Sequence, residues 1–119
     1  MTTNFDELGH IILPPDVIRQ FDLTPPSNLM ITLDEPHTRI VLFPTQESMP
    51  HFETGREIYE YQAPMLRLPT SQWRYIRRMD IKNRVVLPRT MRHVLGWTED
   101  TELHIFTNGT AIYVEQVKS

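Results

Sequence analysis

An internal repeat constrains the fold of this chain more than any other feature of its sequence. The segment DELGHIILPPDVIRQFDL, residues 6–23, aligns without a gap with DIKNRVVLPRTMRHVLGW, residues 80–97. In both segments an aspartate opens a polar turn, and a β-branched run, a proline and a helical stretch follow in the same order. A repeated order of residue classes indicates that one supersecondary unit occurs twice in the chain.

The similarity continues beyond these segments into a predicted β-hairpin in each copy. NLMITL at 28–33 matches ELHIFT at 102–107, and RIVLF at 39–43 matches AIYVE at 111–115. Runs of β-branched and alternating apolar residues are typical of strands. The Asn-Gly pair at 108–109 predicts a two-residue type I′ turn in the second copy, because this turn needs positive φ at both central positions.

Each copy starts with a polar turn that leads into a short strand. Gly9 and Asn83 stand at the same place in the two turns, and both residue types suit a positive φ. Asp6 and Asp80 also recur as a pair. We interpret these aspartates as turn residues that accept hydrogen bonds from their own backbone, rather than as catalytic acids.

A helix of about two turns is predicted after each of these strands. Pro14 and Pro88 end the strands and suit the first position of a helix, where a missing N–H costs nothing. Apolar residues then recur at the i, i+3 and i+4 positions of one helix face. They are Val17, Ile18 and Phe21 in the first copy and Met91, Val94 and Leu95 in the second, where Gly96 is placed to end the helix.

The repeat divides the chain into two units joined by a linker. We assign unit 1 to residues 1–44, an acidic linker with a short helix to residues 45–72, and unit 2 to residues 73–119, with a strand over residues 73–79. A unit of about 40 residues buries too little surface to fold alone. The two units must therefore share a core, within one chain or between chains, which predicts a pseudo-twofold barrel, an interleaved dimer, or both.

Charge is distributed unevenly along the chain. The net charge of the 119 residues is −3, yet eight of the twelve lysines and arginines lie between Tyr61 and Thr98, where Asp80 is the only acid. Such asymmetry indicates a polyanionic partner. The alternative is a solvated surface whose cations pair with acids of the same protein.

Two aromatic residues interleave with arginines at the start of unit 2. Trp73 and Tyr75 alternate with Arg74 and Arg77, a pattern that also occurs where single-stranded nucleic acid stacks its bases on a protein. Packing of alternate strand residues on a core is the simpler interpretation, and we favour it.

Several classes of protein and site are not expected from this sequence. The chain has no cysteine, which excludes disulfides and thiolate chemistry, and it has no apolar run long enough to span a membrane. Its polar, acidic start is unlike a secretory signal peptide. The absence of cysteine suits a reducing cytoplasm, where we expect the protein. Glu102 and His104 are too few to hold a metal ion. Because no convergent set of catalytic groups is visible, we expect no enzyme, no metal and no cofactor.

Residues 80–97 carry a pattern that resembles a known family. D-x-x-x-R-V-V-L-P-R-x-M-R-x-x-L-G-W is similar to the core signature of the AbrB/MazE/MraZ swapped-hairpin superfamily, also called SpoVT-AbrB domains. The resemblance extends over residues 74–117 and, more weakly, over residues 4–44, and two tandem copies resemble the MraZ branch. It implies a mainly β fold with short helices, a swapped-hairpin (double-split) β-barrel built from two tandem strand-turn-strand-helix-hairpin units.

The same resemblance implies a function. It implies a prokaryotic transcription regulator that is cytoplasmic and nucleoid-associated, forms a homodimer or higher homo-oligomer and binds double-stranded DNA, with no membrane partner and no small-molecule substrate. The turn arginine of the family falls on Arg84 and its helix arginine on Arg92. With their basic neighbours these two residues make the predicted DNA-binding set: Arg74, Arg77, Arg78, Lys82, Arg84, Arg89 and Arg92.

Unit 1 departs from the family pattern at the basic positions. It keeps the turn glycine as Gly9, but His10 replaces the turn arginine and Ile18 replaces the helix arginine, with Arg19 next to it. We therefore predict His10 and Arg19 as weaker DNA contacts. The alternative function is a protein-interaction module, antitoxin-like or regulator-binding, in which the acidic linker contacts the partner.

Overall fold

The computed structural model describes residues 2–25, 27–34, 39–47, 53–54, 56–57 and 66–117. Along the chain its elements are β1 (Thr2–Thr3), β2 (His10–Ile12), α1 (Pro15–Gln20), β3 (Asn28–Leu33), β4 (Arg39–Thr45), the 3-10 turn η2 (Thr70–Gln72), β5 (Tyr75–Arg78), β6 (Arg84–Val86), α3 (Arg89–Leu95), β7 (Leu103–Thr107) and β8 (Ile112–Gln116). The mainly β fold with short helices is confirmed. The short helix predicted in the linker falls largely outside the described residues.

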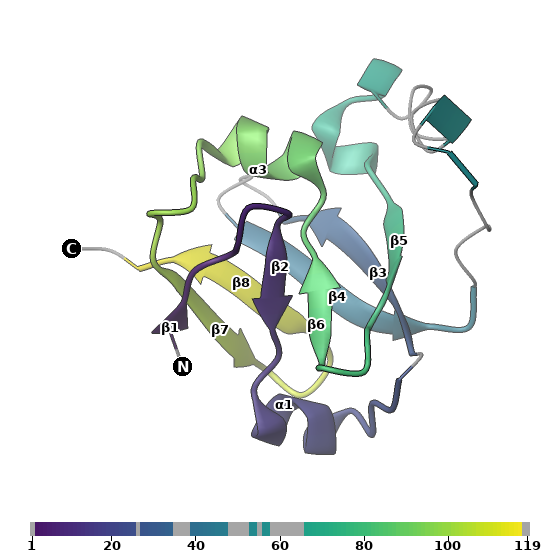
Figure 1. Ribbon diagram of the computed structural model, residues 1–119, viewed down its shortest axis with the longest axis vertical. Coiled ribbons are helices and arrows are strands. Elements are labelled where there is room, and N and C mark those ends of the chain that lie inside the picture. The colour runs from purple at the N-terminus through teal and green to yellow at the C-terminus, as the bar shows by residue number, and fades with distance from the viewer. Residues whose placement is uncertain are drawn as a thin grey trace.

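The strands form two antiparallel sheets. Six strands pair in the order β1-β7-β8-β4-β3-β5, and β2 pairs with β6 in a separate two-stranded ribbon. The β2–β6 ribbon lies over one face of the larger sheet, with α3 at one of its ends and α1 at the other (Figure 1). Among the described residues the six-stranded sheet does not close on itself, so the predicted closed barrel is not found.

Each unit supplies an edge strand to the hairpin of the other unit. β1 of unit 1 pairs with β7, where Thr3 lies opposite Leu103. β5 of unit 2 pairs with β3, where Arg77 lies opposite Leu29. The two pairings match in the repeat, because Thr3 aligns with Arg77 and Leu29 aligns with Leu103. Neither hairpin is therefore completed by its own unit.

Two further pairings relate the units by an approximate twofold axis. In the ribbon Ile11 lies opposite Val85, and in the large sheet Val41 lies opposite Tyr113. Each of these pairs joins residues that occupy the same position in the repeat. An antiparallel pair of equivalent residues has its local twofold axis between them, so the repeat in the sequence becomes a symmetry of the fold.

The core lies between the ribbon and the sheet. Ile11 and Val85 point inward and are fully buried, and they pack on the inward residues of the sheet. Met91 anchors α3 in the same core, whereas Val94, which we expected on the buried face, is 47% exposed. The reason is that α3 has only seven residues and buries a narrow stripe. Gly96 ends this helix in the left-handed conformation, as predicted.

The turn between β7 and β8 differs from the prediction. Thr107 and Ile112 form the last strand pair, so the loop has four residues, and within it only Gly109 has a positive φ. The Asn108 side-chain oxygen accepts hydrogen bonds from the N–H groups of Thr110 and Ala111. The prediction of a two-residue type I′ turn is therefore wrong, because hydrogen bonds to the asparagine side chain stabilise a longer loop.

We predicted a strand over residues 73–79. The strand in the structure, β5, is shorter and covers Tyr75–Arg78. Trp73 and Tyr75 are both buried in the core, and their rings meet edge to face with centroids 6.3 Å apart. The interpretation that these aromatic residues pack on the core is confirmed. No helix in the described part of the chain is long and apolar enough to cross a membrane.

Candidate nucleic-acid interface

The two equivalent turns are built on the same set of hydrogen bonds. The Asp80 carboxylate accepts the backbone N–H groups of Lys82 at 2.9 Å and Arg84 at 2.8 Å. In unit 1 the Asp6 carboxylate accepts the corresponding N–H groups of Leu8 and His10, at 3.0 and 2.9 Å. The interpretation of both aspartates as turn residues is confirmed. Each turn is thereby a rigid support for the side chains at its tip.

A residue with positive φ completes each turn. Gly9 has a φ of 88° and Asn83 a φ of 62°, as the sequence predicted. The N–H group of Gly9 is bonded to the Asp6 carbonyl at 2.9 Å, and that of Asn83 to the Asp80 carbonyl at 3.0 Å. The chain reverses direction within these few residues, which places the side chains of the intervening positions in solvent.

The aspartates also hold the basic side chain that follows each turn. Arg84 donates its Nε–H to Asp80 at 2.8 Å, and His10 Nδ1 lies 3.1 Å from Asp6. Burial tends to raise the pKa of Asp80, but hydrogen bonds from the backbone and side chain of Arg84 outweigh it and lower the pKa. The backbone N–H of His10 is the largest cause of the lowered pKa of Asp6. Both carboxylates therefore stay ionised.

The predicted basic set separates into two groups at opposite ends of the ribbon. Because β2 and β6 are antiparallel, the turn of each unit lies beside the helix of the other unit (Figure 1). Leu13 N–H bonds to the Asn83 carbonyl at 2.9 Å, and Leu87 N–H bonds to the Gly9 carbonyl at 2.8 Å. Lys82 and Arg84 thus lie at the α1 end, and Arg89 and Arg92 at the α3 end with His10.

At the α3 end, Arg92 contacts unit 1. Its Nε–H donates to the Leu87 carbonyl at 2.9 Å, and its guanidinium carbon lies 5.0 Å from the centre of the Phe5 ring. The same guanidinium covers Gly9, where an added Cβ would come within 2.7 Å of it. Desolvation by burial, then the charge of Arg89, lowers the pKa of Arg92. Arg92 therefore joins the units, while Arg89 beside it is exposed.

The three arginines around β5 have different surroundings. Arg74 is exposed and donates to the carbonyls of Ser71 and Trp73, at 3.2 and 2.7 Å. Arg77 lies over the Tyr75 ring, 5.4 Å from its centre. Arg78 is exposed and points to the other face of the sheet, because side chains alternate along a strand.

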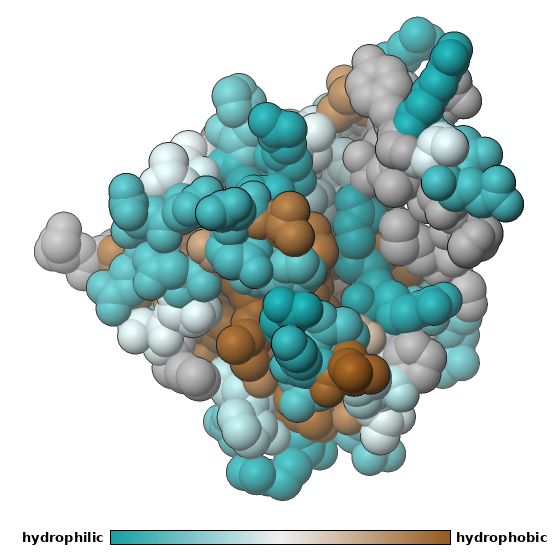
Figure 2. All heavy atoms as spheres, viewed as in Figure 1, coloured by the Kyte–Doolittle hydropathy of each residue, from teal (hydrophilic) through white to brown (hydrophobic). Residues whose placement is uncertain are grey.

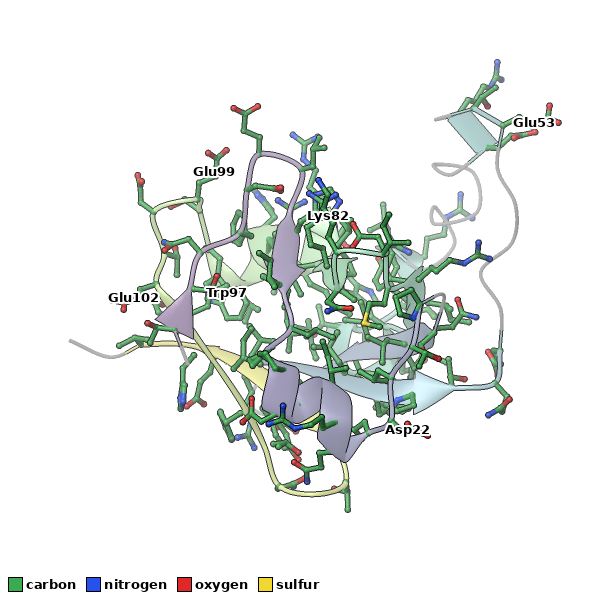
Figure 3. The ribbon with its side chains drawn as sticks, turned by 60° about the horizontal axis from the view of Figure 1, so that its bottom comes forward. Asp22, Glu53, Lys82, Trp97, Glu99 and Glu102 are labelled. Atoms are coloured by element: carbon green, nitrogen blue, oxygen red, sulfur yellow. The ribbon has the colours of Figure 1, made fainter. Side chains whose placement is uncertain are left out.

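Arg77, Lys82 and Arg84 therefore flank one connection, from β5 through the turn to β6, and we call these three residues the β5–β6 surface. Of these, Lys82 has no ion pair within the described part of the chain, and the terminal Nη groups of Arg84 have no hydrogen-bond partner there. In Figure 3 Glu99 and Glu102 project on the other side of β2 from Lys82. Glu99 and Glu102, which follow the basic stretch in sequence, thus do not cover Lys82.

No protein-family model matches this chain, and no curated protein matches it. The resemblance of residues 80–97 to the SpoVT-AbrB signature therefore remains a prediction.

The exposed apolar side chains of the two turns were missed in the sequence analysis. Ile81 is 87% exposed and Leu8 is 70% exposed, the largest values for apolar residues among those described. Figure 2 shows this side of the molecule as mostly hydrophilic, with separate hydrophobic groups between the polar ones. The sequence did contain a signal for this exposure, because Ile81 is an apolar residue inside a polar turn, next to Lys82.

Other predicted groups lie apart from this surface. Arg19 is exposed in the last turn of α1, at the same end of the ribbon as Lys82. His104 lies opposite Glu115 on the large sheet. Within the described residues, no three histidine or acidic side chains gather closely enough to hold a metal ion.

Proposed function

We propose that this chain is a DNA-binding transcriptional regulator of the AbrB/MraZ type and that it contacts duplex DNA through the β5–β6 surface. The observation that carries the proposal is the way in which the turn supports Lys82 and Arg84. Asp80 fixes the backbone of both residues and the Nε of Arg84, and it leaves the Nη groups of this 32% exposed side chain available to a partner. A preorganised cation loses little side-chain entropy when it binds a phosphate.

We also propose that the fold is the swapped-hairpin arrangement, formed within one chain. The exchange of β1 and β5 between the units supports this assignment, because each hairpin is completed by the edge strand of the other unit. The ribbon of β2 and β6 at the centre of the repeat supports it too.

A two-stranded β-ribbon is an element that the proposed partner can accommodate. The major groove of B-DNA, about 12 Å wide, admits a two-stranded β-ribbon. The outward residues of the β2–β6 ribbon include Arg84 and, opposite it, the 53% exposed Ile12. Arginine can form a bidentate contact with a phosphate or with guanine, and lysine contributes a charge to the backbone.

Two substitutions test the DNA-binding surface. We expect Arg84→Ala and Lys82→Ala each to weaken the binding of a fluorescent duplex in anisotropy titrations, by about fivefold or more for Arg84→Ala. The slope of log K against log salt should decrease by about 1 for each phosphate contact that is lost. Arg56→Ala, which removes one positive charge from the linker, is the control and should bind like the wild type. Binding that is unchanged in both test variants, or absent at low salt, would contradict the proposal.

One observation favours the alternative of a protein-interaction module. Ile81 and Leu8 present large apolar side chains at the tips of the turns, and such groups add more to a protein interface than to a phosphate contact. Stoichiometric capture of a protein that is lost on Ile81→Ser, from a chain with no affinity for duplex DNA, would support this alternative.

A further inference from the structure

The face of the large sheet opposite the ribbon has an unusual composition. Side chains alternate along each strand, so one set points toward the ribbon and is buried, and the other set points away. The outward set is centred on Met30, Val41, Phe43, Phe106 and Tyr113, which are all partly exposed and define the outer sheet face. Within the described part of the chain the ribbon and both helices lie on the other side of the sheet (Figure 1).

These apolar side chains are continuous across the strands. Phe106 lies opposite Tyr113, and Tyr113 lies opposite Val41. The rings of Phe106 and Tyr113 stack with centroids 5.3 Å apart, at an interplanar angle of 20°. Phe43 lies opposite Met30 in the next row. The solvent face of an antiparallel sheet is normally polar, so a connected apolar face indicates a surface that binds a partner.

We propose that a second copy of this chain packs on the outer sheet face, around a twofold axis that runs between β4 and β8 and parallel to them. Two sheets packed face to face lie about 10 Å apart with their side chains interdigitated. An interface of this kind is isologous, so the face must be complementary to itself. The charged row beside the apolar residues meets this requirement.

The three charged residues of this row, Glu115, Arg39 and Asp34, alternate in sign across β8, β4 and the end of β3. His104 lies opposite Glu115, and Glu115 lies opposite Arg39. Arg39 in turn bonds to Asp34 at 2.6 Å. A twofold axis between β4 and β8 exchanges these two strands, so it places Glu115 against Arg39 of the second copy. It also brings His104 toward Asp34 of the second copy.

Rotation about the same twofold axis also brings apolar residues of the two copies together. Tyr113 meets Val41 of the second copy, and the Phe106 ring meets the methyl group of Thr32. Glu115 also lines an open hollow of about 450 Å³, which can admit a long side chain beside the carboxylate.

The charges of the outer sheet face favour a second copy of the chain over a nucleic acid as the partner. Stacked aromatic residues can also bind the bases of a single strand, but such surfaces combine aromatic residues with a positively charged groove. Here Glu115 and Asp34 offset the two arginines of the same face, Arg39 and Arg78, so the face is not a positively charged groove. A second copy, which brings both signs of charge, fits the row better.

Sedimentation velocity of the full chain tests the interface. We expect the wild type to sediment as a dimer of the 14.1 kDa chain, and Val41→Lys to weaken dimerisation at least tenfold. Ile12→Lys makes the same kind of change on the ribbon face and should leave the dimer intact. A wild type that stays monomeric up to about 100 μM would overturn the proposal. A dimer that survives Val41→Lys, or a monomer that binds a single-stranded oligonucleotide through this face, would overturn it too.

A charge exchange tests the pairing without touching the apolar residues. Glu115→Arg should weaken the dimer at least tenfold, because two arginines would then face each other across the axis. Adding Arg39→Glu restores opposite charges across the axis and between β4 and β8, although it removes the Arg39–Asp34 ion pair within the chain, so dimerisation should recover relative to Glu115→Arg alone. Circular dichroism checks that each variant is folded. Failure of the double variant to recover, with the fold intact, would overturn the assigned axis.

Discussion

Gly9 lies where the two units touch, and two separate requirements act on it. The turn needs a positive φ there, as it does at Asn83 in the other unit. The guanidinium of Arg92 also covers Gly9, so that a Cβ would collide with it. Asn83 meets only the first requirement, because Ile18 replaces the arginine in unit 1. This explains why one turn has glycine and the other has asparagine.

We expect Gly9→Ala to lower the free energy of unfolding by about 2 kcal/mol, through backbone strain and displacement of Arg92 from the Leu87 carbonyl. Gly96→Ala is the matched control. Gly96 also has a positive φ, but an added Cβ meets nothing within 4 Å, so it should cost about 1 kcal/mol from strain alone. Urea denaturation measures both values. In an Arg92→Ala background the cost of Gly9→Ala should fall to that of Gly96→Ala, and equal costs in the wild type would contradict this account.

Sequence predicted the chemistry inside each turn but not the contacts around it. The Asp, Gly and Asn positions follow from local backbone demands, which residue type reveals directly. The position of Arg92 depends on which turn lies under α3, and that is decided by the pairing of β2 with β6. For the same reason, a basic set that is continuous in sequence is divided between the two ends of the ribbon.

At the scale of elements, the ribbon is stabilised by packing rather than by its length. β2 and β6 have only three residues each, too few for a stable two-stranded hairpin in water. Their central residues Ile11 and Val85 are fully buried against the sheet. The ribbon therefore depends on the core beneath it.

Substitution of the neighbouring residues Ile11 and Ile12 tests whether packing on the core stabilises the ribbon. Ile11→Ala removes a fully buried side chain at the centre of the ribbon and should lower the free energy of unfolding by about 2–4 kcal/mol. Ile12→Ala makes the same change in a side chain that is 53% exposed and should alter it by less than about 0.5 kcal/mol. Chemical denaturation checks the pair. Similar effects of the two substitutions would show that the ribbon is not seated on the core.

Element type was more predictable than element partners. The alternation of apolar residues located the strands of both hairpins to within a residue or two. Proline located the start of both helices to within one residue, since Pro14 and Pro88 stand just before the first helical residue and not at it. Periodicity does not say which strand lies beside which. The loop after β7 was misjudged because the Asn108 side chain makes backbone hydrogen bonds that the sequence pattern does not display.

At the scale of the whole molecule, strand exchange makes each unit dependent on the other. The hairpin of unit 1 is completed by β5, and that of unit 2 by β1. The buried side chains of both units also form one core cluster. Neither half of the chain contains all the strands of its own sheet, in agreement with the expectation that units of this size share a core.

We therefore expect peptides covering residues 1–47 and 66–119 to be unfolded separately and to fold when mixed in equal amounts. Trp73 and Trp97, both 6% exposed in the intact chain, lie in the second peptide and report on burial. Their fluorescence should shift to shorter wavelength only on mixing. Ile11→Ala in the first peptide should weaken the complex. A second peptide that melts cooperatively by itself would contradict this prediction.

The twofold relation between the units has a consequence for how this protein can change. In a symmetric homodimer every substitution enters twice, so a basic residue gained at one end of the central ribbon appears at the other end as well. In this chain the two ends of the ribbon come from different parts of the sequence, so one substitution changes only one end. The axis relates Lys82 at one end of the ribbon to Leu8 at the other, and Arg84 to His10. A single polypeptide can therefore keep the architecture of a dimer while it presents a different chemical face to each half of an asymmetric target.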